Sequence, residues 1–174
     1  MRRETRRRFL ISGLVLGAFA PDILRAEVYQ KPEAFLAEVF DSVPRPKVLW
    51  LTKSIQSEAE KILGHPPADL RQRYWSDGRR DVWILEEIGK EQLITAGFVV
   101  ADGRIEHVRV LAYRESRGQE VREPAFLKQF EDAGLAQGGR LDRNIDGIAG
   151  ATLSVRAMER MARLALYFDR ESRR

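Results

Sequence analysis

The chain has 174 residues, of which 44% are hydrophobic and 32% charged, a composition that suits one globular domain and argues against disorder. It contains no cysteine, which excludes disulfides, iron–sulfur clusters, thiol nucleophiles and zinc sites with thiolate ligands. The formal net charge is +4, but residues 1–26 hold six arginines and two acidic residues, which leaves the rest of the chain with 24 basic and 24 acidic side chains. Because no concentrated basic run follows residue 26, the sequence predicts no nucleic-acid partner.

Residues 1–26 have the pattern of an export signal. An arginine-rich start precedes an apolar run over 9–20, which is shorter than the roughly 20 residues that a helix needs to cross a bilayer. Residues 5–10 resemble the Ser/Thr-Arg-Arg-x-Phe-Leu pattern of twin-arginine signals. An amphipathic or buried N-terminal helix is the alternative, and the arginines that precede it disfavour it. We therefore expect a signal peptide that is cleaved after Ala26 or retained as a weak anchor, and a location in the periplasm or at the outer face of the bacterial inner membrane.

The first part of the domain, residues 27–90, is predicted to contain two helices and a hairpin. The helices are expected over 32–40, with a proline in the first turn, and over 54–63, with Ser54 as the cap. An Asp-Gly pair predicts the turn of a hairpin over 74–85.

The second part, residues 91–174, is predicted to contain a further hairpin over 93–113, a helix that begins near Pro124, a loop over 134–144 and a long helix over 152–169. Hairpins flanked by helices at both ends indicate an α+β domain with one antiparallel sheet.

The two histidines, His65 and His107, are 42 residues apart, in a predicted turn and a predicted strand. Two isolated imidazoles do not indicate a metal site, and no other residues form a catalytic constellation. The sequence therefore predicts neither a metal site nor a catalytic residue, and any redox chemistry would come from an organic cofactor.

Residues 146–154, Asp-Gly-Ile-Ala-Gly-Ala-Thr-Leu-Ser, form a loop of small side chains that leads into the last helix. The small residues that let a ligand approach the backbone are Gly147, Ala149, Gly150 and Ala151. Thr152 stands at the helix N-terminus, where free N–H groups favour a phosphate. There is no P-loop lysine, and the glycine spacing is not that of a dinucleotide fingerprint. On residue types alone, the commoner explanation is a tight turn followed by a Thr or Ser cap.

This stretch resembles the flavinylation motif Asp-x-x-(Ser/Thr/Ala)-Gly-Ala-Thr-x-(Ser/Thr) of the FMN-binding domain family. The resemblance implies FMN joined to the Thr152 hydroxyl by a phosphodiester bond, after transfer from FAD by an ApbE-type flavin transferase. The residues that would form the recognition context are Asp146, Gly150, Ala151 and Ser154. Ala149 stands where many members of the family carry Ser or Thr.

Residues 113–118, Tyr-Arg-Glu-Ser-Arg-Gly, resemble the Arg-Glu-(Thr/Ser)-x-Gly strand end of the same family, and residues 126–130 resemble the helix that follows it. The resemblance therefore covers about residues 95–165. Glu115 and Gly118 either border the flavin or belong to a surface turn without ligand contact.

The leading hypothesis is an exported electron-transfer flavoprotein that exchanges electrons with a membrane-bound or periplasmic redox protein. One alternative is a flavin-binding partner subunit without turnover. Another is a flavin-dependent reductase of a small substrate, against which the sequence offers no acid–base pair.

Overall fold

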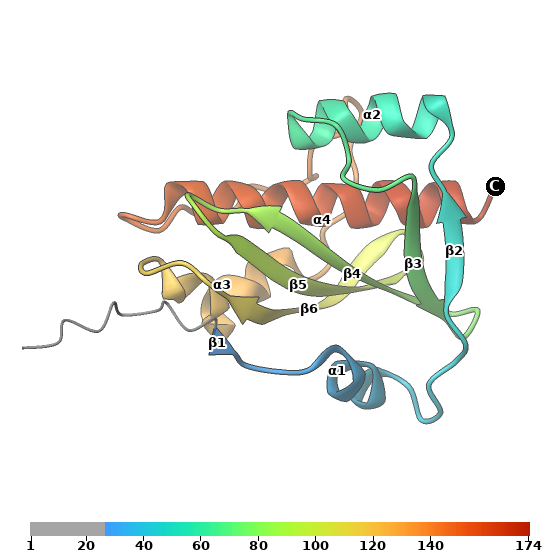
Figure 1. The fold of residues 1–174 in the computed structure, drawn as a ribbon, viewed down its shortest axis with the longest axis horizontal. Coiled ribbons are helices and arrows are strands. Elements are labelled where there is room, and N and C mark those ends of the chain that lie inside the picture. Colours follow the sequence, from blue (N-terminus) through green and yellow to red (C-terminus); the bar gives the residue numbers. More distant parts are fainter. Residues whose placement is uncertain (1–26) are drawn as a thin grey trace, which may run out of the picture.

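The computed structural model describes residues 27–174, and the predicted signal segment lies outside the described residues. A six-stranded antiparallel sheet of order β1-β6-β5-β4-β3-β2 forms the centre of the fold (Figure 1). The strands are β1 (Glu27–Val28), β2 (Lys47–Trp50), β3 (Arg71–Ser76), β4 (Arg80–Ile88), β5 (Leu93–Ala101) and β6 (Arg104–Tyr113). The helices are α1 (Pro32–Val39), α2 (Lys53–Leu63), α3 (Pro124–Leu127) and α4 (Thr152–Ser172), with short 3₁₀ helices at Gln119–Arg122 and Lys128–Phe130. The predicted α+β class is confirmed.

Strands β4, β5 and β6 form a meander. The β4–β5 pairing runs from Arg80 opposite Ala101 to Ile88 opposite Leu93. Asp102 and Gly103, with φ angles of 51° and 72°, make the tight turn into β6, as an Asp-Gly pair between strands does. Strand β5 is buried almost throughout because helices cover both faces of the sheet there.

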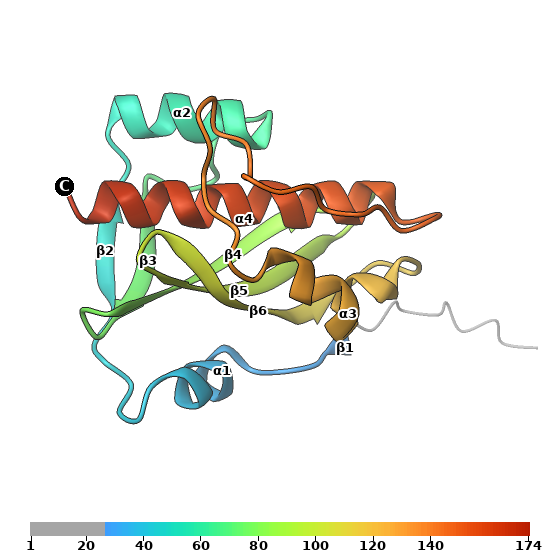
Figure 2. The same cartoon turned by 180° about the vertical axis from the view of Figure 1, so that it is seen from behind.

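Helix α4 covers one face of the sheet, α2 packs against α4, and α1 packs on the other face of the sheet (Figures 1 and 2). The larger core cluster lies on the α4 side, where α4 buries an apolar stripe. The members of that stripe are Val155, Met158, Met161, Ala162, Leu164 and Ala165. The smaller cluster joins Phe35, Leu36 and Phe40 to residues of β4, β5 and β6. Helix α4 therefore lies across the sheet from end to end, with its first residue at one side of the molecule and its last residue at the other.

Several local predictions are corrected by the structure. The cap of α2 is Thr52 rather than Ser54, because the Thr52 hydroxyl accepts a hydrogen bond from the N–H of Ile55 at 3.4 Å. The helix that begins at Pro124 is a single turn that continues as a 3₁₀ helix. Helix α4 runs to Ser172 instead of ending at Asp169. Strand β4 extends three residues past the predicted hairpin, to Ile88.

Within residues 27–174, no helix is both long enough and apolar enough to cross a membrane. In the same part of the chain, no three His, Asp or Glu side chains lie together in a way that could hold a metal ion.

Candidate functional site

A hollow of about 570 Å³ opens at the N-terminal end of α4. Three segments line it: the β4–β5 turn, the chain just after β6, and the start of α4. The lining residues are Lys90, Glu91, Glu115, Ser116, Arg117, Gly150, Ala151, Thr152, Leu153 and Ser154. A hollow of this size matches the range of small-molecule and cofactor sites.

Thr152 is the first residue of α4, and its side chain is exposed. The N-cap position is taken by Ala151, which has no side-chain acceptor, so Thr152 does not act as a helix cap. The backbone N–H groups of Thr152, Leu153 and Ser154 donate no hydrogen bond to any described residue. A free hydroxyl therefore stands beside three free N–H donors at the positive end of the helix dipole, which is an arrangement that suits a phosphate.

Ser154 faces the interior and is only 4% exposed. Its hydroxyl lies 3.0 Å from the phenol oxygen of Tyr113, and that phenol donates its own proton to the carbonyl of Arg117. The Ser154 hydroxyl is therefore the donor to Tyr113. Burial raises the pKa of Tyr113, which keeps the phenol protonated in this chain of hydrogen bonds. Ser154 thus ties the first turn of α4 to the segment after β6.

Gly118 lies beneath the hollow and not in a free surface turn. It has a φ of +85°, and a Cβ at this position would lie 2.7 Å from the Tyr113 hydroxyl and 2.9 Å from the Ala151 Cβ. Only glycine combines this backbone conformation with so close an approach. Gly118 therefore lets the segment after β6 pack directly against the start of α4.

Glu115 holds the β4–β5 turn in place. It is 8% exposed, and its Oε1 atom accepts hydrogen bonds from the N–H groups of Lys90, Glu91 (2.7 Å) and Gln92 (3.0 Å). Burial by itself raises the pKa of Glu115, but the three N–H donors outweigh it and the net pKa is lowered. An ionised carboxylate therefore fixes the backbone of the turn that forms one wall of the hollow.

The same hairpin is anchored from its other side. Arg160 of α4 donates to the buried carboxylate of Glu87 at 2.8 Å and to the carbonyl of Ile88 at 3.2 Å. The Nε2 atom of His65 lies 3.2 Å from both oxygens of Glu87. The carbonyl of Pro66, together with Glu87, raises the pKa of His65. His65 thus supports the hairpin and does not line the hollow.

The structure brings only some of the predicted site residues together. Those that line the hollow are Glu115, Gly150, Ala151, Thr152 and Ser154. Asp146, Gly147 and Ala149 are exposed and lie outside the lining. Asp146 nevertheless has a structural contact, because its N–H donates to the side chain of Gln129 at 2.7 Å and fixes the start of the motif.

Sequence reasoning missed the lining residues Lys90, Glu91, Ser116, Arg117 and Leu153. Lys90 and Glu91 belong to the β4–β5 turn, whose side chains form no motif. Only Glu115, which accepts hydrogen bonds from the backbone of this turn, could have indicated that the turn is part of the site. The guanidinium of Arg117 has no ion-pair partner among residues 27–174, which leaves it available to an anion in the hollow.

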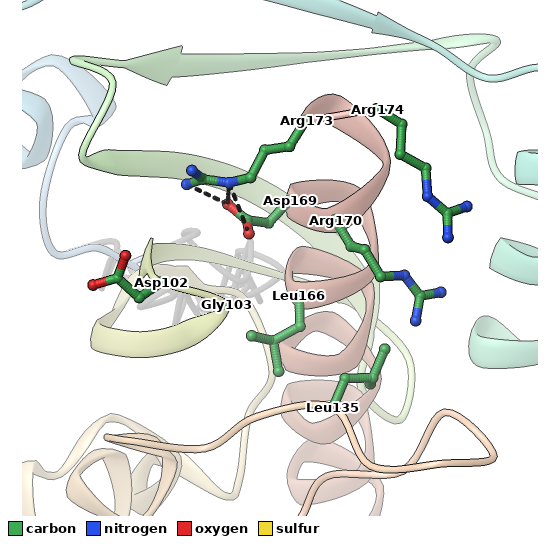
Figure 3. A pocket seen from close by; sticks show the side chains of 8 residues that line it. All are labelled: Asp102, Gly103, Leu135, Leu166, Asp169, Arg170, Arg173 and Arg174. Carbon is green, nitrogen blue, oxygen red and sulfur yellow. Dashed lines mark hydrogen bonds and ion pairs between the residues drawn. The ribbon is translucent and has the colours of Figure 1, made fainter.

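A second hollow, of about 390 Å³, lies at the opposite end of α4, and Figure 3 shows Asp169 and Arg173 bonded to each other in its wall. Burial raises the pKa of Asp169 to about 6, and hydrogen bonding to Asp81 adds to this effect. Arg173 also contacts Asp81, at 3.1 Å. No predicted site residue lies here, and the cluster holds the end of α4 to β4.

Residues 89–167 match the model of the FMN-binding domain. The match begins in the β4–β5 turn and includes the whole lining of the hollow at the start of α4. This part of the chain therefore matches the FMN-binding domain that its motifs resemble.

The fold as a whole is similar to the crystal structure of NqrC from Shewanella oneidensis, with a TM-score of 0.57 and 14% sequence identity. The likeness covers 79% of this chain and 88% of that chain, and at this identity it is a likeness of fold. No curated protein matches the chain.

The residues present fit FMN. The free N–H groups at the start of α4 can receive its phosphate, the small residues before Thr152 leave room along the backbone, and Leu153 adds an apolar wall.

Proposed function

We propose that the chain is an electron-transfer flavoprotein that carries FMN covalently on the hydroxyl of Thr152. The observation that carries this proposal is the exposed Thr152 side chain, which makes no cap hydrogen bond and stands beside unused N–H donors within an FMN-binding domain. When bound, the flavin supplies the capacity to accept and release electrons.

The attachment chemistry requires a reachable hydroxyl and an external enzyme. The Thr152 oxygen attacks the phosphorus of the FMN half of FAD, the pyrophosphate P–O bond breaks, and AMP leaves. The hydroxyl proton passes to a base of an ApbE-type flavin transferase, so the chain itself needs no base beside Thr152. The nearby carboxylate of Glu115 is indeed committed to the β4–β5 turn. Exposure of Thr152 gives the transferase access to it.

The chain's own residues would hold and orient the group. The N–H groups at the start of α4, with Arg117, receive the phosphate, and the clasp between Glu115 and the β4–β5 turn keeps the wall of the hollow in place. The sequence of residues 1–26 supports export to the periplasm or the outer face of the inner membrane, where a covalent link prevents loss of the flavin by dilution. The electron-transfer partner would be a membrane-bound or periplasmic redox protein.

The attachment is tested by co-expressing the full chain with an ApbE-type transferase and imaging flavin fluorescence in a denaturing gel. We expect fluorescence for the unaltered chain and for Thr152→Ser, which keeps a hydroxyl, and none for Thr152→Ala. Intact mass should show a gain of one FMN less one water in the fluorescent samples. Fluorescence that persists in Thr152→Ala would overturn the assignment of the attachment residue.

Electron transfer is tested separately with the flavin-loaded protein. Isolated inner membranes supplied with a respiratory donor should bleach the flavin absorbance, and an oxidised periplasmic extract should restore it. A loaded protein whose flavin never changes redox state in either mixture would favour the flavin-binding partner subunit without turnover.

A further inference from the structure

Within residues 27–174, one part of the sheet has no helix over it. Helix α1 packs on the face formed by β4, β5 and β6, and the outward side chains of β2 lie beyond it. Val48 and Trp50 are therefore 41% and 64% exposed. An exposed tryptophan on a sheet face is unusual for a soluble surface, where large aromatic side chains are mostly covered.

The register of β2 and β3 places two arginines beside these apolar side chains. Trp50 pairs with Arg71, and Val48 pairs with Arg73. Residues directly opposite each other in an antiparallel pair point to the same face of the sheet. The four side chains therefore form one surface, which we call the ribbon patch.

The two arginines of the ribbon patch have no direct ion-pair partner among residues 27–174. Arg71 and Arg73 are exposed, and neither guanidinium forms an ion pair or a hydrogen bond with any residue in 27–174. Residues 42–57 and 70–76, which build this end of the sheet, contain no acidic residue. Their basic residues are Arg45, Lys47, Lys53, Arg71 and Arg73.

We propose that the ribbon patch docks on an anionic lipid bilayer. Tryptophan is favoured at the level of the lipid headgroups, and clustered Lys and Arg are attracted by anionic lipids. Exposed aliphatic side chains lie nearby in the chain, Val43 at 44% and Leu70 at 65%, and they can enter the headgroup region with Trp50.

Other occupants fit this surface less well. A second copy of the chain, placed by a two-fold axis, would set Arg71 and Arg73 against the same arginines of its partner. Single-stranded nucleic acid needs several aromatic platforms for successive bases, and in the ribbon patch Trp50 is surrounded by arginine and aliphatic side chains.

The ribbon patch lies far from the candidate flavin site. Strands β2 and β3 stand beside the C-terminal end of α4, whereas Thr152 is at its N-terminal end (Figure 1). A helix of 21 residues is about 30 Å long. A protein docked through the ribbon patch would therefore hold the hollow at Thr152 away from the membrane surface and open to a partner. The docking itself does not depend on the flavin.

The test is co-sedimentation of the full, flavin-free chain with vesicles of phosphatidylcholine alone or mixed equally with phosphatidylglycerol. We expect binding to the mixed vesicles. Each arginine near an anionic surface changes partitioning about five-fold, so Arg71→Gln/Arg73→Gln should bind about thirty-fold more weakly. The fluorescence of Trp50 should shift to shorter wavelength on binding, and Trp50→Phe should remove that shift.

The matched control is Arg140→Gln/Arg156→Gln, which removes the same charge from two exposed positions away from the ribbon patch. It should bind like the unaltered chain to within about two-fold. Every variant keeps residues 1–26, so any contribution of that segment cancels, and circular dichroism checks that each variant folds. Equal weakening by both double substitutions would overturn the proposal, because only overall charge would then matter. The proposal would also be overturned if the chain did not bind vesicles but instead formed dimers, or bound a single-stranded oligonucleotide, in a way that depends on Arg71 and Arg73.

Discussion

The clasp between Glu115 and the β4–β5 turn gives a prediction about stability that is independent of any cofactor. In Glu115→Gln the side chain keeps nearly the same shape and one acceptor oxygen, but it loses the charge. The three N–H groups of Lys90, Glu91 and Gln92 would then bond a neutral amide, or turn towards water.

The size of the effect follows from the number of hydrogen bonds. A hydrogen bond to a charged group contributes about 1.5–3 kcal/mol, and a neutral one about 0.5–1.5 kcal/mol. Three such differences set an upper limit of about 4 kcal/mol for the loss in Glu115→Gln. Because the three donors share one oxygen and their turn is open to solvent, we expect the free energy of unfolding to fall by about 2 kcal/mol. For a domain of this length that corresponds to a Tm lower by about 6 °C.

The lowered pKa of Glu115 also predicts how the effect of Glu115→Gln on the free energy of unfolding changes with pH. The folded-state pKa of Glu115 is lowered, so its stabilisation is present above the ordinary carboxyl pKa and is lost as the pH falls through the folded value. Urea unfolding should therefore show the full difference between the unaltered chain and Glu115→Gln at pH 7, and a shrinking difference below about pH 4.

Glu120→Gln is the matched control, because Glu120 is exposed and forms no ion pair among the described residues. It should change the free energy of unfolding by less than about 0.5 kcal/mol. Amide hydrogen exchange at Lys90, Glu91 and Gln92 should become faster in Glu115→Gln only. A Glu115→Gln chain as stable as the control at pH 7 would refute the role assigned to the clasp.

Three further predictions concern other parts of the fold. Gly118→Ala should lower the free energy of unfolding by about 2–3 kcal/mol in urea titrations, because it adds a close contact to a left-handed backbone. Gly138→Ala, with φ +80° and open space around the position, should lower it by only about 1 kcal/mol. Equal losses in the two variants would contradict the close packing at Gly118. Because the pKa of Asp169 is raised to about 6, this group should lower the free energy of unfolding as the pH rises from about 4 to 6, by at most about 3 kcal/mol. In Asp169→Asn, this contribution to the pH dependence of urea unfolding should disappear. In an NMR titration His65 should show a pKa above 6.5 and His107, whose pKa is lowered mainly by burial, one below it; the reverse order would contradict the packing around both rings.

The sequence was most informative where a local pattern had a local cause. The long helix expected from residue 152 and the Asp-Gly turn between β3 and β4 both depend on neighbours in the chain, and both are present. The cap of α2 was misplaced by two residues because Thr52 and Ser54 are both good caps and their hydroxyls bond each other at 3.0 Å.

The site was predictable only in part, because its walls meet through long-range contacts. The motif around Thr152 was legible as a loop of small residues before a helix. The position of the β4–β5 turn in the site could not be predicted. Glu115 holds this turn through its backbone N–H groups, and almost every residue type has such a group.

The ribbon patch was missed for a related reason. The sequence showed no concentrated basic run after residue 26, and that statement remains true along the chain. Folding nevertheless aligns Arg71 and Arg73 with Trp50 and Val48 from another strand, because cross-strand register decides which side chains share a face.

The clasp at Glu115 also bears on how this protein can diverge. A carboxylate that grips main-chain amides places no demand on the identity of Lys90, Glu91 or Gln92, whose side chains are all exposed. Mutation can therefore exchange charge and bulk at the rim of the hollow while the frame of the turn is preserved. Every substitution at these three positions except proline keeps the backbone N–H group. The side chains at the rim can therefore change to suit a new binding partner while the fold of the domain stays the same.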